Sequence, residues 1–328
     1  MGYKTRLMQQ TRKLLITGGL GYVGGRIASH LEKVSPVSIR IMTHRSNDTP
    51  PDWARKFEIC YGDMEDTDTL VSAVKDVDAV IHLAALNELE SQDNHIKALY
   101  VNGVGTNRLL EACISMQVKQ FIYFSTFHVY GPSSTQPISE NSPTRPVHPY
   151  AFTHRIAEDY VNWYSRTSDI NTLILRLSNG YGYPMTPNVN RWSLVFNDLC
   201  NQAINQKTIS LKSSGRQHRD FISLQNVARA VEHFLFAENV NWDDGLFNLG
   251  GNCSLAISEV ANIIAQEYSF NYGIDLPITL GPPDIYETSD KVSYNIDKLL
   301  KTGFTLIDNM KEEIHRTFEI CNLKNEKK

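Results

Sequence analysis

The chain has 328 residues, of which 41% are hydrophobic and 10% aromatic, so it is long enough for about two domains and apolar enough to bury a core. This composition excludes intrinsic disorder, collagen-like sequences and small disulfide scaffolds. With 32 Lys and Arg against 36 Asp and Glu, the net charge of -4 offers no basic field for a phosphate backbone, and no nucleic-acid partner is expected.

The first half of the chain alternates apolar runs of strand length with segments of helical period, as βαβ units do. Strands are predicted at residues 13–17, 38–43, 57–61, 79–83, 120–125 and 172–178. Helices are predicted between them at residues 21–33, 67–75, 96–116 and 150–166. This order predicts an α/β fold with a doubly wound parallel sheet, of the Rossmann type.

The rhythm changes after residue 178, where NGYGYPMTPNVNR is rich in Gly, Pro and Asn and indicates a loop that leaves the sheet. A helix at 193–205, a strand at 208–211, a helix after RDFISLQNVARAV, a strand at 246–250 and C-terminal helices follow. We predict a first domain over residues 11–178, to which 220–250 return, and a smaller α/β lobe from 179–219 and 251–320. Residues 1–10 and 321–328 are predicted to be flexible ends.

Three glycines follow the first predicted strand in LLITGGLGYVGG: Gly18, Gly21 and Gly24. Glycines here allow a tight turn and bring backbone N–H groups close to a pyrophosphate, whose charge is favoured at a helix N-terminus. The pattern predicts a dinucleotide site that includes Tyr22 and Val23. The alternative is a glycine turn with a purely structural role.

The end of the second strand bears on the choice of dinucleotide. A fold that prefers NAD usually has an acidic residue there, about 20 residues after the glycines. This chain instead has Thr43, His44, Arg45 and Ser46. Arg45 is suited to pair with a 2′-phosphate, with Thr43 and Ser46 assisting, so NADP is favoured over NAD. The alternative is that Arg45 is an ordinary solvated loop charge.

The ends of the next two strands are predicted to continue this site. Asp63, after the third strand, is placed to meet the adenine edge. In HLAAL, after the fourth strand, small residues stand where the cofactor would pass the carboxyl ends of the strands: Leu83, Ala84 and Ala85.

The ordered motifs TGGLGYVGG, GDMED, HLAA, VNGVGTNRLLEAC, FIYFSTFHVYG, HPYAFTH, LRLSNGYG, GRQHRDFISLQNVA and FNLGG span nearly the whole chain. Together they resemble the extended short-chain dehydrogenase/reductase family, the NAD(P)-dependent nucleotide-sugar epimerases, dehydratases and reductases. The resemblance implies an enzyme that transfers a hydride at C4 of a nucleotide-activated sugar. It also implies that Met64 and Asn102 lie beside the cofactor and that the smaller lobe binds the substrate.

In that family a tyrosinate takes the proton of a sugar hydroxyl, and a Lys four residues later assists it. Tyr150 matches this Tyr, and Thr126 matches the Ser or Thr that hydrogen-bonds the reacting oxygen. A free phenol with a pKa of about 10 is almost wholly protonated at neutral pH, so the base needs a neighbour that lowers its pKa.

The position of the family lysine holds His154. Imidazole has a pKa of about 6.5 and a shorter reach than lysine, so it lowers the pKa of Tyr150 less unless it is held protonated. Arg155 points about 100° away around the helix and is a poor substitute. Three interpretations stay open. His154 replaces the lysine toward the ribose and the phenol, the chemistry is slower or needs higher pH, or the protein binds cofactor without turnover.

His128 occupies a position where similar enzymes carry a second acid/base residue. A histidine there can shuttle a proton at the sugar ring or protonate a leaving hydroxyl. The alternative is a strand-end histidine that bonds to backbone. Phe127 and His128 stand where the family's dehydratases have an Asp-Glu pair, which disfavours water elimination.

For the substrate, Arg219 and Asn179 resemble the family residues that meet the diphosphate of the nucleotide sugar. An Arg fork suits phosphate oxygens, although Arg219 could instead form a structural ion pair with Asp220. Arg191 and Trp192 are further candidates for contacts with base or sugar. The nucleotide, the sugar and the direction of reaction stay open, and the rival hypothesis is a cofactor-binding sensor or scaffold.

The remaining features point to a soluble intracellular protein. The five Cys have no metal-ligand spacing, so no zinc site is expected and a reducing compartment is favoured. No apolar run reaches the ~20 residues needed to span a bilayer, and the N-terminus has no signal-like apolar stretch. We expect a cytoplasmic protein without a membrane partner. The resemblance implies a homodimer through helices 96–116 and 150–166. The other histidines singled out are expected to be packing or surface residues: His30, His82, His95 and His315.

Overall fold

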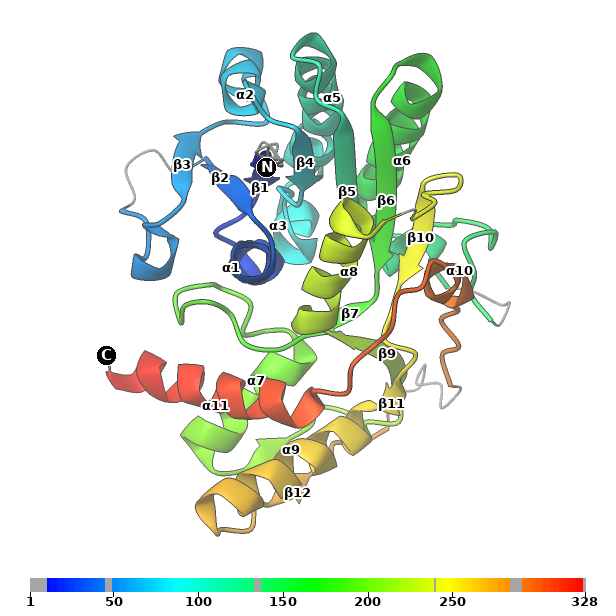
Figure 1. Ribbon diagram of the computed structural model, residues 1–328. Coiled ribbons are helices and arrows are strands. Elements are labelled where there is room, and N and C mark those ends of the chain that lie inside the picture. Colours follow the sequence, from blue (N-terminus) through cyan, green and yellow to red (C-terminus); the bar gives the residue numbers. More distant parts are fainter. Residues whose placement is uncertain (1–10, 45–48, 133–136, 239, 284–290, 327–328) are drawn as a thin grey trace, which may run out of the picture.

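The computed structural model describes residues 11–44, 49–132, 137–238, 240–283 and 291–326, and Figure 1 shows a sheet-containing lobe above a smaller one. The larger lobe holds a seven-stranded sheet in the order β10-β6-β5-β4-β1-β2-β3, and every pairing in it is parallel. Its strands are β1 Arg12–Thr17, β2 Val37–Thr43, β3 Glu58–Tyr61, β4 Ala79–His82, β5 Gln120–Thr126, β6 Asn171–Leu177 and β10 Leu246–Leu249. The predicted doubly wound fold is confirmed, with strand ends that differ by one residue.

Helices cover both faces of this sheet. On one face lie α1 Tyr22–Val34 and α8 Leu224–Phe236, and on the other α2 Thr67–Val74, α5 Gly105–Ser115 and α6 Pro149–Thr167. Successive side chains of a strand point to opposite faces, so Leu14 and Ile16 join the first core while Leu15 joins the second.

The segment predicted as a single helix at 96–116 is more complex. It runs as α4 His95–Ala98, a wide π-helical stretch Leu99–Val104 and then α5. A further helix, α3 Glu88–Asp93, precedes it and begins with a capping box between Asn87 and Glu90. The π-helical turn carries Asn102, and such turns are frequent at functional sites.

The smaller lobe has its own core and two small sheets. Strands β7 Asn179–Tyr181, β9 His218–Ser223 and β11 Ser254–Ala256 form one sheet, and β8 Ile209–Ser210 pairs with β12 Ile278–Thr279 in the other. Helices α7 Val195–Gln206, α9 Ile257–Tyr272 and α11 Met310–Glu326 pack around Phe196, Ile264 and Phe318. The helix predicted at 193–205 therefore begins two residues later, and the strand at 208–211 is shorter.

Two parts of the chain differ from the predicted division. Residues 321–326 were expected to be a flexible end, but α11 continues to Glu326 and Cys321 is fully buried, because this last turn packs an apolar side chain into the lobe. The stretch around α10 Asp297–Lys301, assigned to the smaller lobe, joins the core of the first lobe instead. The hydroxyl of Tyr294 donates to the carbonyl oxygen of Arg176 at 2.7 Å and anchors it there.

A buried ion pair joins the two lobes. Arg26 of α1 binds Glu313 of α11 through two hydrogen bonds, Nη1 to Oε2 at 2.7 Å and Nη2 to Oε1 at 2.6 Å. Both side chains are at most 4% exposed. This paired fork fixes the position of the smaller lobe against the helix that follows the glycine turn.

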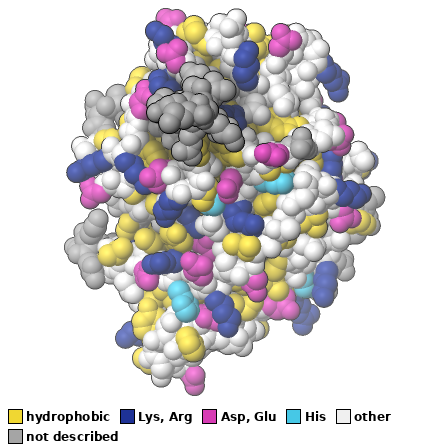
Figure 2. All heavy atoms as spheres, in the orientation of Figure 1, with side chains coloured by type: hydrophobic (Ala, Val, Ile, Leu, Met, Phe, Trp, Pro, Cys, Tyr) yellow, Lys and Arg dark blue, Asp and Glu magenta, His cyan; other side chains and the backbone are white. Residues whose placement is uncertain are grey.

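On the face seen in Figure 2, Lys and Arg side chains are interspersed with Asp and Glu. The remaining short helical turns are η1 Asp52–Ala54 and η3 Phe127–Tyr130. Within the described ranges, none of the helices combines the length and the apolar character that crossing a membrane requires.

Candidate active site

The glycine turn between β1 and α1 is built for close approach. Gly18 has a φ of +67°, and a Cβ on Gly24 would lie 2.7 Å from the Cα of Gly19 and closer still to the carbonyl oxygen of Gly18. Gly21 caps α1 without a side-chain hydrogen bond, which leaves first-turn N–H groups for another acceptor. These residues fit the pyrophosphate of a dinucleotide.

The side chain of Tyr22 points away from this turn. Its hydroxyl donates to the carbonyl oxygen of Gly182 at 2.7 Å and to Oδ1 of Asn197 at 3.1 Å, both in the smaller lobe. Val23 packs against the first-lobe core. Tyr22 and Val23 can therefore contact a cofactor only through their backbone groups.

The other predicted cofactor residues lie where neighbouring strands end. Thr17 Oγ1 accepts hydrogen bonds from the N–H groups of Leu83 and Ala84, both at 3.1 Å, and so joins the end of β4 to the glycine turn. Ala85, next in the chain, is half-buried. Because β3, β2, β1 and β4 are adjacent in the sheet, their carboxyl ends form one edge.

At the β3 end of that edge, Asp63 Oδ1 accepts from the N–H of Glu65 at 2.9 Å, and Met64 packs against Gly105. Asn102 is buried, where Oδ1 accepts from the N–H of Leu86 at 2.8 Å and Nδ2 donates to Thr153 at 3.1 Å. Arg45 and Ser46 lie outside the described residues.

Tyr150 and Thr126 come together as predicted. Helix α6 begins at Pro149 and is capped by His148, whose Nδ1 accepts from the N–H of Ala151 at 3.3 Å. This cap places Tyr150 in the first turn, where it interacts with Thr126 at the end of β5. Burial raises the pKa of Tyr150, as does the negative charge of Glu88, while Arg191 and the interaction with Thr126 lower it.

His154 lies one turn after Tyr150, and their ring centroids are 4.4 Å apart. Its Nδ1 is 2.6 Å from the hydroxyl of Tyr123 on β5. Its Nε2 is buried and has no hydrogen-bond partner in the described part of the chain. Burial lowers the pKa of His154 to about 4, against the opposing charges of Glu158 and Glu88, so the side chain is neutral at pH 7. It does not supply the positive charge of a lysine.

His128 faces the same cluster. Its ring lies 6.2 Å from Tyr150 and 5.1 Å from His148, measured between centroids. Its backbone N–H bonds Thr126, whereas its imidazole makes no hydrogen bond to any described residue. Burial and the neighbouring His148 lower the pKa of His128 to about 4. The imidazole is therefore neutral and uncommitted beside the phenol.

Three residues of this cluster were not predicted from sequence: Glu88, His148 and Tyr123. Glu88 opens α3 and forms an ion pair at 3.2 Å with Arg191, which precedes α7 of the smaller lobe. The capping pattern from Asn87 to Glu90 could have indicated a helix start there. Tyr123 stands inside an apolar strand, where the sequence pattern indicates only a core residue.

The predicted substrate residues share one pocket with Phe127 and Tyr294. Asn179 Nδ2 donates to the backbone oxygen of Asp220 at 2.9 Å. The carboxylate of Asp220 accepts from Ser178, Gly251 and Cys253, so the alternative ion pair with Arg219 is not formed. The guanidinium of Arg219 has no anionic partner among the described residues.

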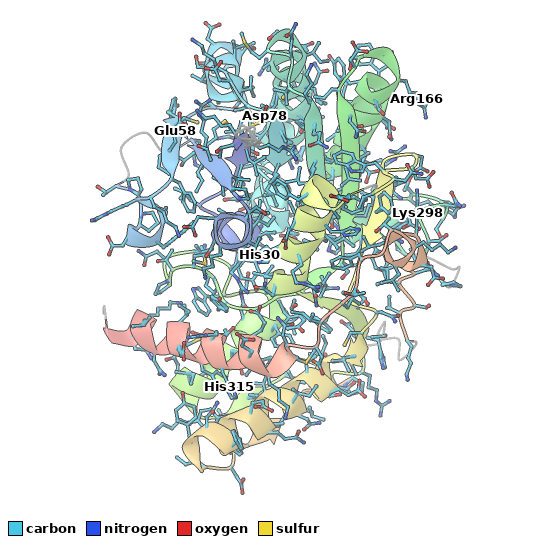
Figure 3. The ribbon with its side chains drawn as sticks, in the orientation of Figure 1. His30, Glu58, Asp78, Arg166, Lys298 and His315 are labelled. Carbon is cyan, nitrogen blue, oxygen red and sulfur yellow. The ribbon has the colours of Figure 1, made fainter. Side chains whose placement is uncertain are left out.

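The histidines expected to be structural are bonded away from this cluster. His82 is buried between Thr17 and Thr106, His30 bonds Glu232 at 2.7 Å, and His315 bonds Glu267 at 2.9 Å. Figure 3 shows His30 on α1 and His315 on α11, in different lobes. His95 is exposed at the start of α4, and Trp192 donates to the backbone oxygen of Pro187. Across the described ranges, no three His, Cys, Asp or Glu side chains are grouped to hold a metal ion.

Comparison with known proteins identifies a family and related structures. A sequence model of the NAD dependent epimerase/dehydratase family matches residues 14–250. A provisionally named UDP-glucose 4-epimerase of Methanocaldococcus jannaschii is 30% identical over 78% of this chain and 83% of its own length. The dTDP-D-glucose 4,6-dehydratase of Mus musculus is 27% identical over 78% of this chain and 72% of its own length.

Among solved structures, the UDP-N-acetylglucosamine 4-epimerase from Methanobrevibacter ruminantium M1, in complex with UDP-N-acetylmuramic acid, superposes with a TM-score of 0.81. The match covers 96% of this chain and 99% of that one, at 24% sequence identity. At this identity the likeness establishes the fold alone.

Proposed function

The chain is an enzyme of the NAD-dependent epimerase/dehydratase family, and from this premise we propose that it transfers a hydride at C4 of a nucleotide-activated sugar. The first lobe binds the cofactor and the smaller lobe the substrate. The observation that carries the proposal is the position of Tyr150, in the first turn of α6, where it interacts with Thr126 at the end of β5, on the carboxyl edge of the sheet. It brings a proton acceptor and an orienting hydroxyl to the edge where the glycine turn also lies.

The residues that would hold the cofactor are the glycine turn and the strand ends, because the turn is so tight that a Cβ on Gly24 would collide with its backbone. When bound, a nicotinamide dinucleotide supplies the hydride acceptor. We infer NADP rather than NAD because Arg45 and Ser46 replace an acidic residue after β2. Replacing Arg45 by Ala should then weaken binding of NADPH about tenfold and leave that of NADH unchanged, as isothermal titration measures. Equal effects on both would refute the preference.

Tyr150 acts as the base that takes the proton of the reacting hydroxyl, and Thr126 holds that oxygen by its own hydroxyl. His154 is neutral, so it assists by hydrogen bonding rather than by charge. His128 is the second acid/base, since its imidazole is uncommitted and near Tyr150. No carboxylate pair precedes Val129, so elimination of water is not the proposed reaction.

Arg219 and Asn179 are proposed to bind the diphosphate of the substrate. The support is that Arg219 has no anionic partner in the described ranges and that both residues line one pocket. Arg191 forms an ion pair with Glu88, which interacts with Tyr150, and would lie near the sugar.

We also propose a cytoplasmic homodimer. The segment from α4 to α5 and helix α6 would form its interface. Four large exposed apolar side chains lie on these elements: Ile96, Tyr100, Phe152 and Trp163. Such exposed apolar surface is what a dimer would cover.

The test is turnover with UDP-, GDP-, CDP- and dTDP-sugars, followed by reduced-nicotinamide absorbance and by chromatography of the sugars. A 4-epimerase converts the sugar without net absorbance change and retains its cofactor. A dehydrogenase or 4-ketoreductase changes the absorbance in proportion to product. Product formation that persists in Tyr150→Phe would refute the mechanism.

A second candidate is a cofactor-binding sensor or scaffold, favoured by the neutral His154 in place of lysine. Tight cofactor binding with no product from any nucleotide sugar, at any pH at which the protein stays folded, would support it over the enzyme mechanism.

A further inference from the structure

Beneath Tyr150, two buried side chains form a pair that the proposed reaction does not use. Tyr123 of β5 and His154 of α6 are each 3% exposed. The hydroxyl of Tyr123 is 2.6 Å from Nδ1 of His154, and this is the one hydrogen bond that either side chain makes within the described residues. The opposite ring nitrogen, Nε2, is buried without a partner.

The direction of this hydrogen bond follows from the strengths of the two donors and acceptors. Each direction leaves one buried donor without an acceptor: the phenolic O–H if Nδ1 donates, and Nε2–H if Tyr123 donates. A phenol is the more acidic donor of the two, and the unprotonated imidazole nitrogen is the stronger acceptor. The arrangement in which Tyr123 donates to Nδ1, and Nε2 carries the proton, is therefore favoured.

His82, a neighbour of Tyr123, shows what a closed chain of this kind looks like. Thr17 Oγ1 already accepts two backbone N–H bonds, so its own proton goes to Nδ1 of His82 at 2.7 Å. Nε2 of His82 then donates to Thr106 at 3.0 Å, and Thr106 donates to the backbone oxygen of Asn102 at 2.6 Å. Every proton in that chain has an acceptor.

The hydrogen-bonded chain from Tyr123 through His154 has the same order, but its last donor, Nε2–H, has no acceptor in the described residues. A buried N–H without an acceptor marks a place where something binds. Nε2 lies on the ring that contacts Tyr150. Because Nε2 is buried, a ligand hydroxyl reaches it only when neighbouring side chains move.

We propose that Tyr123 is a positioning residue, which donates to Nδ1 of His154 and thereby presents Nε2–H as an uncharged donor to a ribose hydroxyl of the bound dinucleotide. This inference rests on the proposed function for the presence of a dinucleotide beside Tyr150. It goes beyond that function in assigning the proton of His154 and the residue that holds it. Tyr123 touches neither the sugar nor the reacting atoms.

The first test needs no sugar and no turnover. In protein labelled with ¹⁵N-histidine, long-range ¹H–¹⁵N correlations at pH 7.5 distinguish the two neutral tautomers. The His154 signals are identified by their loss in His154→Lys. We expect Nε2–H with unprotonated Nδ1 in the native protein, and a mixture of tautomers in Tyr123→Phe. A native His154 with its proton on Nδ1 would overturn the proposal, whether or not any variant folds.

The second test measures binding of NADPH and NADH by isothermal titration. Tyr123→Phe should weaken binding roughly 3- to 10-fold, as expected when one hydrogen bond loses its orientation. Within a His154→Lys background, the same substitution should change binding less than about twofold, because an ammonium donates without a tautomer. Tyr164→Phe is the matched control, because it removes a phenol hydroxyl from α6, the helix that carries His154. It should bind both dinucleotides as the native protein does.

An equal loss of affinity in both backgrounds would show that Tyr123 only packs, and would overturn the proposal. These outcomes are separate from those of the proposed function. If no nucleotide sugar is turned over, the tautomer and the dependence on background still decide the role of Tyr123.

Discussion

Two buried polar regions of the molecule differ in how completely their donors and acceptors are hydrogen-bonded. At the lobe junction, Arg26 meets Glu313 through two hydrogen bonds, donates to the backbone oxygen of Tyr183 at 3.1 Å, and stacks over its ring at 3.7 Å. In the Tyr150 cluster, the buried Nε2 of His154 has no hydrogen-bond partner among the described residues. The first region is complete without a ligand. The second leaves donors and acceptors free, which is what a binding site requires and what a purely structural core avoids.

This contrast predicts that substitutions in the two regions affect different measurements. Changes in the Tyr150 cluster should alter turnover more than stability. Changes at the lobe junction should alter the free energy of unfolding first. The predictions below run from the largest expected effect to the smallest.

Tyr150→Phe removes the proton acceptor and keeps the ring. We expect turnover of the nucleotide sugar to fall roughly 10²- to 10⁴-fold, the usual contribution of a general base. The free energy of unfolding, measured with urea, should stay within about 1 kcal/mol of the native value. Tyr164→Phe is the control and should keep full turnover. A stability loss as large as the rate loss would remove the distinction between the two regions.

Glu313→Gln leaves the guanidinium of Arg26 buried without its counter-charge. We expect a loss of about 3–5 kcal/mol in the free energy of unfolding, because the remaining charge is uncompensated. The double variant Arg26→Met with Glu313→Leu should recover much of this loss, since apolar residues of similar volume avoid the buried charge. Urea denaturation of the native protein, the Glu313→Gln variant and the double variant measures these free energies of unfolding. A double variant no more stable than the single one would contradict this account.

The cluster should also make the fold sensitive to acid. Burial lowers the pKa of His82 to about 3 and those of His128 and His154 to about 4, below the ordinary value of 6.5. The groups that face them include Glu88, Glu158 and His148, and the carboxylates oppose the shift. As pH falls from 6.5 toward 4, the unfolded chain takes up protons that the folded protein refuses. The stability that these histidines contribute is therefore fully present above pH 6.5 and is lost as the pH falls from 6.5 toward 4.

Each fully buried histidine should contribute a slope of up to about 1.4 kcal/mol per pH unit, and the half-buried His128 less. Urea denaturation at intervals between pH 7.5 and 5 measures this slope. His154→Gln should flatten it, and a slope that the substitution leaves unchanged would contradict the assignment.

His154→Lys restores a cation beside the phenol. Because burial raises the pKa of Tyr150, turnover by the native protein should increase as the pH rises toward the pKa of this phenol. An ammonium one turn away lowers the pKa of the phenol, so the variant should reach the same rate about one pH unit lower, with roughly tenfold higher turnover at pH 7. His154→Gln, which is neutral, is the control and should keep the native profile shape. Identical pH profiles in all three proteins would show that position 154 does not influence the base.

Much of the fold was predictable from the chain because its signals are local. Apolar runs located the six strands within one residue, and the glycine spacing placed the turn after β1. The wide turn that carries Asn102 was not predictable, because a π-helical stretch has no period distinct from the helices on either side. Tyr294 was assigned to the wrong lobe, because its sequence neighbours do not indicate that its hydroxyl bonds Arg176.

The sequence alone determined which chemical groups are available: three glycines that must lie close to backbone, a phenol at position 150 and an imidazole where relatives have an ammonium. The charge state of that imidazole was decided only by the tertiary structure, because the pKa of His154 is lowered mainly by burial between segments that are distant in the chain. Protonation depends on the dielectric and the donors around a group, and these exist only once the sheet and α6 have packed. The same packing left Nε2 of His154 without a hydrogen-bond partner in the described part of the chain, which no pattern of residues along the sequence could have indicated.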